Sequence, residues 1–292
     1  MLRVPVLGVY HTDFPAYIDH LFEDHALTTL CEGFMRFFYS PFSAIFTRSD
    51  DYVEALTALG LPEDRTVSLM PGFDNEVFHV RNRDESIFKK LGVEKNLPLL
   101  TKAWKRAHAK IAEQGREAEL IVVGDGPYRE TMQDTLKNAG VHYLGFRSGD
   151  ELTAIYASCD YFIFPSITDT LGQVVMESQG SGLPVLVTDQ GGPKEVVRDR
   201  ESGFVLDHED LSAWVDHIAM LSTDDARREQ MSEAAHTLMQ TYSIRHSFEH
   251  FWDVHIEAWH EHLARRGVQP NSPEQVYRSR PRHDRQQAAT DQ

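Results

Sequence analysis

Two carboxylates separated by a turn have the clearest chemical potential in this sequence. Asp169 and Glu177 stand eight residues apart in the segment Pro165-Ser166-Ile167-Thr168-Asp169-Thr170-Leu171-Gly172-Gln173-Val174-Val175-Met176-Glu177. An apolar run leads into this segment, which predicts a strand, a tight turn and then a helix. Eight residues are about two helical turns, so both carboxylates can face a ligand that lies on the helix N-terminus.

The N-terminus of such a helix favours phosphate, because its first backbone N–H groups have no partner inside the helix. A carboxylate beside it accepts hydrogen bonds from neighbouring hydroxyl groups, such as those of a ribose or a hexose. A phosphate site flanked by two carboxylates therefore predicts a nucleotide-sugar ligand.

Two glycine loops follow predicted strands and favour the same edge of a sheet. Gly124-Asp125-Gly126-Pro127 comes after the strand 120–123, and Gly191-Gly192-Pro193-Lys194-Glu195 comes after the strand 184–187. Ligands of parallel sheets gather at the carboxyl ends of the strands, so Gly124 and Gly126 are candidate binding residues. The alternatives are a turn capped by Asp125 with Pro127 at the first helical position, and a flexible connection at Gly191.

Lys95 and His11 are candidates to contact the reacting end of the ligand. Lys95 opens a long helix that ends near Gly115, and it could neutralise a leaving diphosphate or be an ordinary solvated charge. His11 ends the first strand, where an imidazole could hydrogen-bond a sugar or phosphate, or could simply lie in a partly exposed loop.

No metal or other cofactor is predicted. Among the late histidines, His246 and His250 share an i,i+4 spacing, but His260-Glu261-His262 is not an H-E-x-x-H motif, so a solvated amphipathic helix is expected. No two aspartates are separated by a single residue, which removes the simplest metal clamp for a diphosphate. Positive charge must then come from side chains and helix ends.

The composition limits the partners. The 292 residues include 29 basic and 45 acidic side chains, and the net charge of −16 opposes general binding to nucleic acid or anionic lipid. Four aromatic residues at helical spacing favour a core face over a membrane contact: Phe34, Phe37, Phe38 and Tyr39. At most a weak peripheral membrane contact is expected.

The two cysteines, Cys31 and Cys159, lie far apart without a C-x-x-C pattern, which favours a reducing cytoplasm. No apolar run approaches a membrane span, and the first residues do not resemble a signal peptide. The chain begins as though in the middle of a domain.

Short apolar runs alternate with amphipathic stretches, which predicts an α/β fold with parallel sheets. Strands are expected at 4–9, 44–47, 66–70, 119–123, 142–144, 161–165 and 184–187. Ser49 and the pair Ser148 and Glu151 are predicted to cap helices, and the stripe of Leu211, Trp214, Val215, Ile218 and Leu221 predicts a core helix. The segment Pro71-Gly72-Phe73-Asp74 is expected to join two units.

Taken in order, these motifs resemble the retaining glycosyltransferases of GT-B architecture, in the large family that contains bacterial glycan and glycolipid synthases. The resemblance covers roughly 4–242. It depends on the following segments: Pro71-Gly72-Phe73-Asp74 with Phe78, Glu94-Lys95-Asn96-Leu97, Gly124-Asp125-Gly126-Pro127, Leu144-Gly145-Phe146, Tyr156 with Asp160, Pro165-Ser166, the acidic-x7-Glu element, Gly182-Leu183-Pro184-Val185, and Gly191-Gly192 with Glu195.

The resemblance implies a role for each matched residue. Asp169 would contact the donor sugar, the backbone of Thr170, Leu171 and Gly172 would hold the diphosphate, and Glu177 would bind the ribose. Lys95 would stabilise the leaving diphosphate, and His11 would lie near the family's active-site histidine. The family usually has glutamate where this chain has Asp169, which shortens the reach by one methylene.

Two further departures concern the chain itself. Family members have a strand and a Gly-Arg pair before the E-K-N-L segment, whereas Lys90-Leu91-Gly92 here runs directly into Val93-Glu94-Lys95. Losing a buried parallel strand would damage the sheet. The opening strands of the acceptor domain are also missing, so a truncated and internally deleted relative is expected.

The resulting expectation is a GT-B type α/β fold of two Rossmann-like units, the N-terminal one incomplete, plus C-terminal helices. Its parts would be an acceptor-side remnant at 1–75, a nucleotide-sugar donor domain at 76–242, a C-terminal helix at 243–266 and a disordered tail at 267–292. The leading function is transfer of a hexose from a nucleotide-diphosphate sugar to a glycan or lipid acceptor hydroxyl, with retention. The alternatives are a catalytically impaired nucleotide-sugar-binding fragment and a sugar-nucleotide epimerase.

Overall fold

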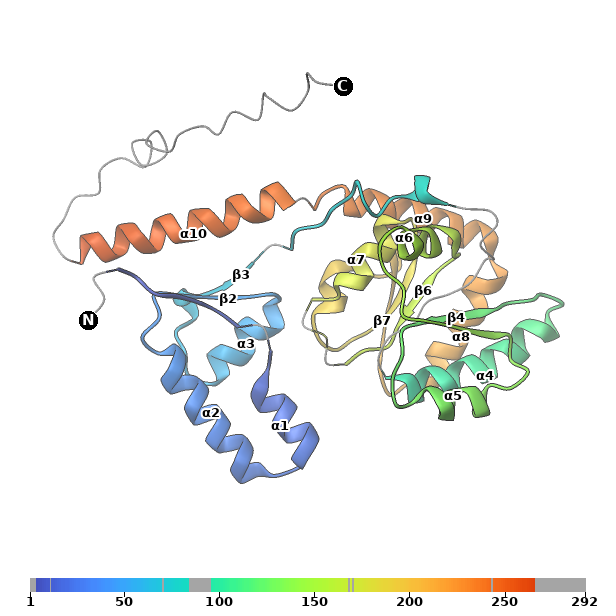
Figure 1. Ribbon diagram of the computed structural model, residues 1–292, viewed down its shortest axis with the longest axis horizontal. Helices are drawn as coiled ribbons and strands as arrows, with labels where there is room; N and C mark the ends of the chain where they lie inside the picture. The colour runs from blue at the N-terminus through green and yellow to red at the C-terminus, as the bar shows by residue number, and fades with distance from the viewer. Residues whose placement is uncertain are drawn as a thin grey trace, which may run out of the picture.

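Parallel strands and covering helices build two units in the computed structural model, which describes residues 4–10, 12–69, 71–83, 96–167, 169, 171–242 and 244–265. We call 4–69 the N-terminal unit and 96–242 the C-terminal unit. Figure 1 shows them side by side, with the last helix, α10 (Ile244–Ala264), returning from the C-terminal unit to lie along the N-terminal one.

The N-terminal unit is a three-stranded sheet with helices. Its strands are β1 (Leu7–Val9), β2 (Ala44–Thr47) and β3 (Thr66–Ser68), which pair in parallel in that order. The helices are α1 (Phe14–Phe22), α2 (His25–Tyr39) and α3 (Asp50–Ala58), followed by the short turn η1 (Glu63–Arg65). The ring of Phe46 in β2 lies 4.9 Å from that of Phe251, so α10 packs directly on this sheet.

The C-terminal unit alternates strands and helices. Its elements are α4 (Leu97–Glu113), β4 (Leu120–Val123), α5 (Arg129–Thr135), β5 (Val141–Gly145), α6 (Gly149–Ser158), β6 (Phe162–Phe164), α7 (Gln173–Gly180), β7 (Val185–Thr188), η3 (Gly192–Val196), β8 (Gly203–Leu206), α8 (Leu211–Thr223) and α9 (Asp225–Met239). The strands form two parallel ladders, β4-β5 and β6-β7-β8; among the described residues no ladder joins β4 to β6.

Side-chain packing holds these two ladders together. Trp104 of α4 and Trp214 of α8 are fully buried in one cluster with Val122 of β4 and Ile163 of β6. Both indole N–H groups are satisfied, because Trp104 donates to the carbonyl of Ala139 at 2.7 Å and Trp214 to that of Asp207 at 2.9 Å. The predicted core stripe of α8 is therefore confirmed.

Two chain segments cross between the units next to each other. Phe73 is buried in the C-terminal unit, close to Gly180 of α7, where a Cβ would lie 2.2 Å from its ring. At Gly72 a Cβ would lie 3.3 Å from the Cα of Ile244, the first residue of α10. The outgoing chain, which continues through η2 (Val80–Asn82), and the returning chain thus pack together at the junction.

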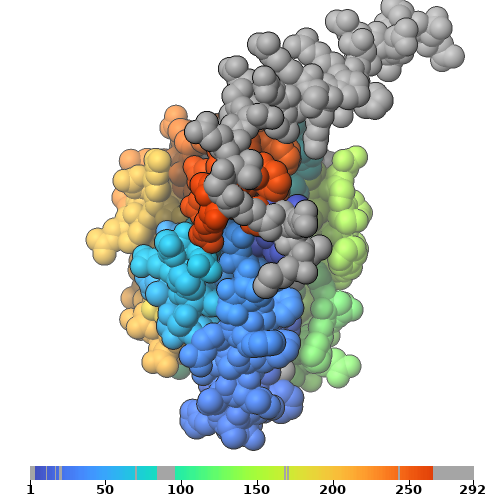
Figure 2. Space-filling view, turned by 90° about the vertical axis from the view of Figure 1, so that its left-hand side faces the viewer, coloured from blue at the N-terminus to red at the C-terminus, as the bar shows by residue number. Residues whose placement is uncertain are grey.

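The seven predicted strands are confirmed, and β8 is an additional strand. The predicted core position is wrong for Phe34, Phe37 and Phe38, which are 60%, 78% and 48% exposed, while their neighbour Tyr39 is buried. Helix α2 packs through Met35 and Tyr39, and the α1–α2 hairpin projects below the rest of the N-terminal unit (Figures 1 and 2), so the opposite face of α2 has no core to enter.

Ser148 and Ser49 occupy the predicted N-cap positions of α6 and α3, but neither side chain makes the expected capping hydrogen bond within the described part of the chain. At Ser148 the next residue, Gly149, has φ +59°, so the first residue of α6 departs from helical geometry next to the serine. At Ser49 another residue takes the helix N–H groups, as described below. The predicted tail at 267–292 lies outside the described residues, and the domain boundaries stay a prediction.

Candidate functional site

The carboxylate of Asp169 closes the turn that leads into α7. Its Oδ1 atom accepts hydrogen bonds from the backbone N–H groups of Leu171 at 3.1 Å and Gly172 at 2.7 Å. Gly172 has a left-handed backbone (φ 74°, ψ 44°) and leads directly into the helix at Gln173. The predicted strand, turn and helix are therefore present, and a carboxylate lies in the turn just before the anion-binding end of the helix.

The loops after β6 and β7 touch through glycines. A Cβ on Gly172 would lie 2.8 Å from the Cα of Pro193, and one on Gly191 would lie 2.6 Å from the carbonyl oxygen of Asp169. The N–H of Gly192 donates to that same carbonyl at 3.0 Å. Glycine is needed at both positions, because a side chain would push the two loops apart.

A pocket of about 200 Å³ opens beside the first glycine loop. Its lining is mostly apolar and comes from Val123, Gly124, Phe146, Arg147, Leu152, Ile155, Tyr156, Cys159, Phe162 and Val174. Gly124 has φ 111°, and a Cβ on Gly124 or Gly126 would meet no atom within 4 Å. Helix α5 begins at Arg129, so the alternative that placed Pro127 at the first helical position is wrong.

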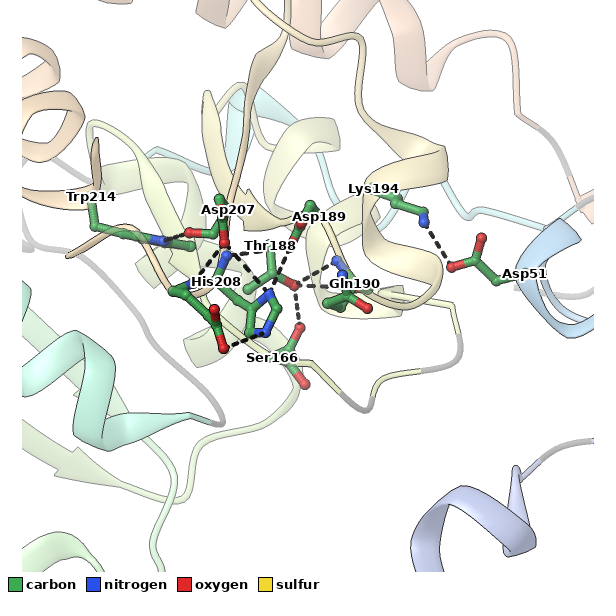
Figure 3. A network of polar contacts seen from close by, with 10 residues as sticks. Asp51, Ser166, Thr188, Asp189, Gln190, Lys194, Asp207, His208 and Trp214 are labelled. Carbon is green, nitrogen blue, oxygen red and sulfur yellow. Dashed lines mark hydrogen bonds and ion pairs between the residues drawn. The ribbon is translucent and has the colours of Figure 1, made fainter. Parts of the chain in front are cut away.

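A polar cluster joins the ends of β6, β7 and β8 (Figure 3). The hydroxyl of Thr188 donates to the carbonyl of Ser166 at 2.7 Å, and Asp189 Oδ1 lies 3.0 Å from His208 Nδ1. Partial burial acts to raise the pKa of Asp189, but hydrogen bonds from the side chain and backbone of His208 outweigh it and hold that pKa below its usual value. Asp189 therefore ties the end of β7 to the turn after β8.

This cluster also includes a metal-capable group that the sequence analysis did not identify. Donor atoms of Asp189, Asp207 and His208 lie within 4.8 Å of one another. His208 Nδ1 is at hydrogen-bond distance from Asp189, so we describe these residues as a hydrogen-bonded pair that holds β7 and β8 together, and call this pair the clamp.

The segment after Gly191-Gly192 contacts the N-terminal unit. Both carboxylate oxygens of Glu195 accept hydrogen bonds from α3, from the N–H of Asp50 at 3.0 Å and of Asp51 at 3.2 Å. Lys194 Nζ lies 2.8 Å from Asp51 Oδ2, and Figure 3 shows these two side chains meeting from opposite units. Burial raises the pKa of the Glu195 carboxyl, although the two backbone hydrogen bonds act in the other direction.

In the N-terminal unit, the side chains of Tyr10, Tyr52 and Asp13 lie close to one another. The hydroxyl of Tyr10 donates to Asp13 at 3.1 Å, and the rings of Tyr10 and Tyr52 lie 5.9 Å apart. Burial, followed by the charges of Asp13, Asp169 and Asp51, raises the pKa of Tyr52 to about 12. Asp169 of the C-terminal unit is thus close enough to Tyr52 of the N-terminal unit to contribute to the rise of its pKa.

The structure brings together part of the predicted site. Asp169, Leu171 and Gly172 form the turn that leads into α7, and Glu177 is half-buried about one turn into that helix. Gly124 and Gly126 lie on the loop beside the pocket. His11, Lys95 and Thr170 lie outside the described residues.

The two units of parallel strands and helices form a fold of the GT-B type, which the similarity to solved structures shows. The structure is similar to that of sucrose-phosphate synthase from Thermosynechococcus elongatus, with a TM-score of 0.69 at 15% identity over 86% of this chain and 67% of the other. It is also similar to Anabaena HepE in complex with UDP and glucose, with a TM-score of 0.67 at 18% identity over 86% and 71% of the two chains.

At the sequence level, residues 86–238 match the family model described as glycosyl transferases group 1, and the chain belongs to this family. It is 29% identical to sulfoquinovosyl transferase SQD2 from Arabidopsis thaliana, over 84% of this chain and 50% of that protein. It is 25% identical to a GDP-mannose-dependent alpha-mannosyltransferase from Corynebacterium glutamicum, over 80% and 57%. The chain spans about half the length of these curated relatives.

Proposed function

We propose that this chain takes part in transfer of a hexose from a nucleotide-diphosphate sugar to an acceptor hydroxyl, with retention at the anomeric carbon. The observation that carries the proposal is the α7 N-terminus, where Asp169 and the N–H groups of Leu171 and Gly172 lie beside two glycine loops. Helix N-termini bind phosphate, and a carboxylate next to one can hydrogen-bond a sugar hydroxyl.

The pocket beside Gly124 would take the planar base, because its lining is mostly apolar and open at the glycine. Glu177 would accept hydrogen bonds from the ribose. The diphosphate would lie on the N–H groups of Leu171 and Gly172, which now donate to Asp169 Oδ1. Its arrival would release that carboxylate toward the sugar.

Charge stabilisation would carry the chemistry, with the α7 N-terminus and Lys95 receiving the leaving diphosphate and His11 near the sugar. The residues proposed for this step include no metal ligand set. The acceptor would be a glycan or a lipid that approaches from the N-terminal unit.

A weak peripheral membrane contact would suit a lipid acceptor, and the exposed rings of Phe34, Phe37 and Phe38 support it. No helix among the described residues is long and apolar enough to cross a membrane. We propose a cytoplasmic location, because the two cysteines, Cys31 and Cys159, lie far apart in the sequence and follow no disulfide framework.

A nucleotide-sugar-binding module without turnover is the second candidate, and the separation of β4 from β6 among the described residues favours it. The relatives named above are transferases or a synthase, which does not favour the epimerase alternative.

Calorimetric titration with UDP and GDP, followed by release of free nucleotide from UDP- and GDP-sugars, tests the proposal. We expect binding of one nucleotide and turnover that rises when acceptor is added. Binding without turnover would support the module, and an absence of binding to either nucleotide would overturn both.

A further inference from the structure

Helix α3 of the N-terminal unit begins with an arrangement that its own sequence does not explain. Ser49 precedes the helix in extended geometry and is a favourable capping residue, yet its hydroxyl is buried and has no hydrogen-bond partner within the described residues. The N–H groups of Asp50 and Asp51 donate instead to Glu195, which lies 144 to 145 positions away in the chain.

Negative charge predominates in this contact, with one lysine opposing it. Asp50, Asp51 and Glu195 bring three carboxylates to one helix end, where the unpaired N–H groups favour negative charge. Lys194 adds an ion pair with Asp51 at 2.8 Å, and both side chains are about one-third exposed. The ion pair is therefore partly open to solvent.

The same short segment touches the predicted diphosphate site. Gly191 and Gly192 pack on the carbonyl of Asp169, and Pro193 packs on Gly172 at the start of α7. Lys194 and Glu195 follow immediately and reach α3. A continuous path of direct contacts therefore runs from the α7 N-terminus through η3 to the N-terminal unit.

We propose that Lys194 and Glu195 are positioning residues that fix the N-terminal unit against the donor site by capping α3 from the other unit. The proposal rests on the proposed function, since it is the donor-to-acceptor alignment that the contact would set. When the units separate, the Ser49 hydroxyl accepts hydrogen bonds from the N–H groups at the start of α3 in place of Glu195. Separation of the units therefore costs little free energy.

Spin labels at exposed positions of the two units measure the contact directly. Glu54→Cys on α3 and Glu130→Cys on α5, in a Cys31→Ser background, give one inter-label distance in the full chain. Glu195→Gln keeps the shape but weakens the acceptor, and we expect it to broaden a narrow distance distribution. Glu201→Gln, an exposed carboxylate of the same unit, is the matched control and should change nothing.

Reversing both charges of the Lys194–Asp51 ion pair tests whether the contact can be restored. Lys194→Glu should broaden the distribution, and adding Asp51→Lys should narrow it again. Calorimetric titration of Glu195→Gln with UDP and GDP should give affinities within about twofold of the parent chain, while sugar transfer falls about tenfold or more through misalignment.

Failure of the positioning role can be distinguished from failure of the proposed function. If no nucleotide binds the parent chain, the proposed function fails, yet the inter-label distances still test the contact between the units. If Glu195→Gln and Lys194→Glu both leave the distance distribution as narrow as Glu201→Gln does, the positioning role is overturned. An equal loss of nucleotide affinity and transfer would also overturn it, because it would place Glu195 in the donor site itself.

Discussion

Replacing Gly172 by alanine tests whether the start of α7 depends on its close approach to the second glycine loop. Two costs are expected. Alanine in the left-handed region costs about 1 kcal/mol, and the new Cβ would lie 2.8, 3.1 and 3.2 Å from three atoms of Pro193. The ring and backbone of proline cannot rotate away, so the loop must move by about 0.6 Å to reach the 3.4 Å at which ordinary contact begins.

Overpacking of this kind adds about 2 kcal/mol, which gives about 3 kcal/mol in all. For a chain of this size the Tm of Gly172→Ala should fall by about 6–12 °C. Gly115→Ala is the matched control, because Gly115 has φ 70° against 74° for Gly172 but no atom within 4 Å of a Cβ. Its Tm should fall by only about 2–4 °C.

The same shift displaces the Gly172 N–H proposed to hold the diphosphate. Loss of one hydrogen bond to a charged group should weaken nucleotide binding about 10–100-fold in Gly172→Ala and leave Gly115→Ala unchanged. Scanning calorimetry and titration with UDP and GDP measure both effects. Equal Tm losses in the two variants, or equal nucleotide affinities, would refute the reasoning that close packing of these loops shapes the site.

Three further substitutions probe other parts of the molecule. Glu177→Ala should weaken nucleotide binding about 10–100-fold through lost ribose hydrogen bonds, whereas the exposed Gln173→Ala on the same helix should not; titration that finds both unchanged contradicts the assignment. The lowered pKa of Asp189 means that its pairing with His208 stabilises the fold above the ordinary carboxyl pKa and loses that effect as the pH falls through the lowered value. The Tm gap between the parent chain and Asp189→Asn should therefore shrink between about pH 5 and pH 2, and a constant gap would argue against the clamp. Phe37→Ser should leave the Tm within about 2 °C because Phe37 is exposed, but should reduce co-sedimentation with neutral phosphatidylcholine vesicles; undiminished binding would remove this face from the membrane contact.

Local patterns identified most of the fold, since the strands are short apolar runs bounded by turn residues and the core stripe of α8 has clear helical spacing. Strand β8 was missed because Gly203-Phe204-Val205-Leu206 begins with a glycine and directly follows a polar turn. The aromatic residues of α2 were misplaced because a helical apolar face indicates that something should cover it, but not that the fold supplies the cover.

The site was predictable to the extent that it is local. Asp169, Gly172 and Glu177 lie on one strand-turn-helix unit, so their spacing was informative. The cap on α3 was not predictable, because Glu195 meets Asp50 and Asp51 only through the arrangement of two units. The pairing of Asp189 with His208 likewise depends on β7 and β8 being neighbours.

The two separate ladders of the C-terminal unit give it a seam. Val122 and Ile163 belong to one buried cluster that spans it, whereas the described residues place no backbone ladder between β4 and β6, so side-chain packing joins the two halves. The apolar pocket straddles this seam, with Val123 and Gly124 on one side and Phe162 and Val174 on the other. A base bound there would bridge the halves and stabilise the unit by mass action, so amide hydrogen exchange in β4 and β6 should slow together when nucleotide is added. The ligand itself would then serve as the clamp that joins the two halves of its own binding site.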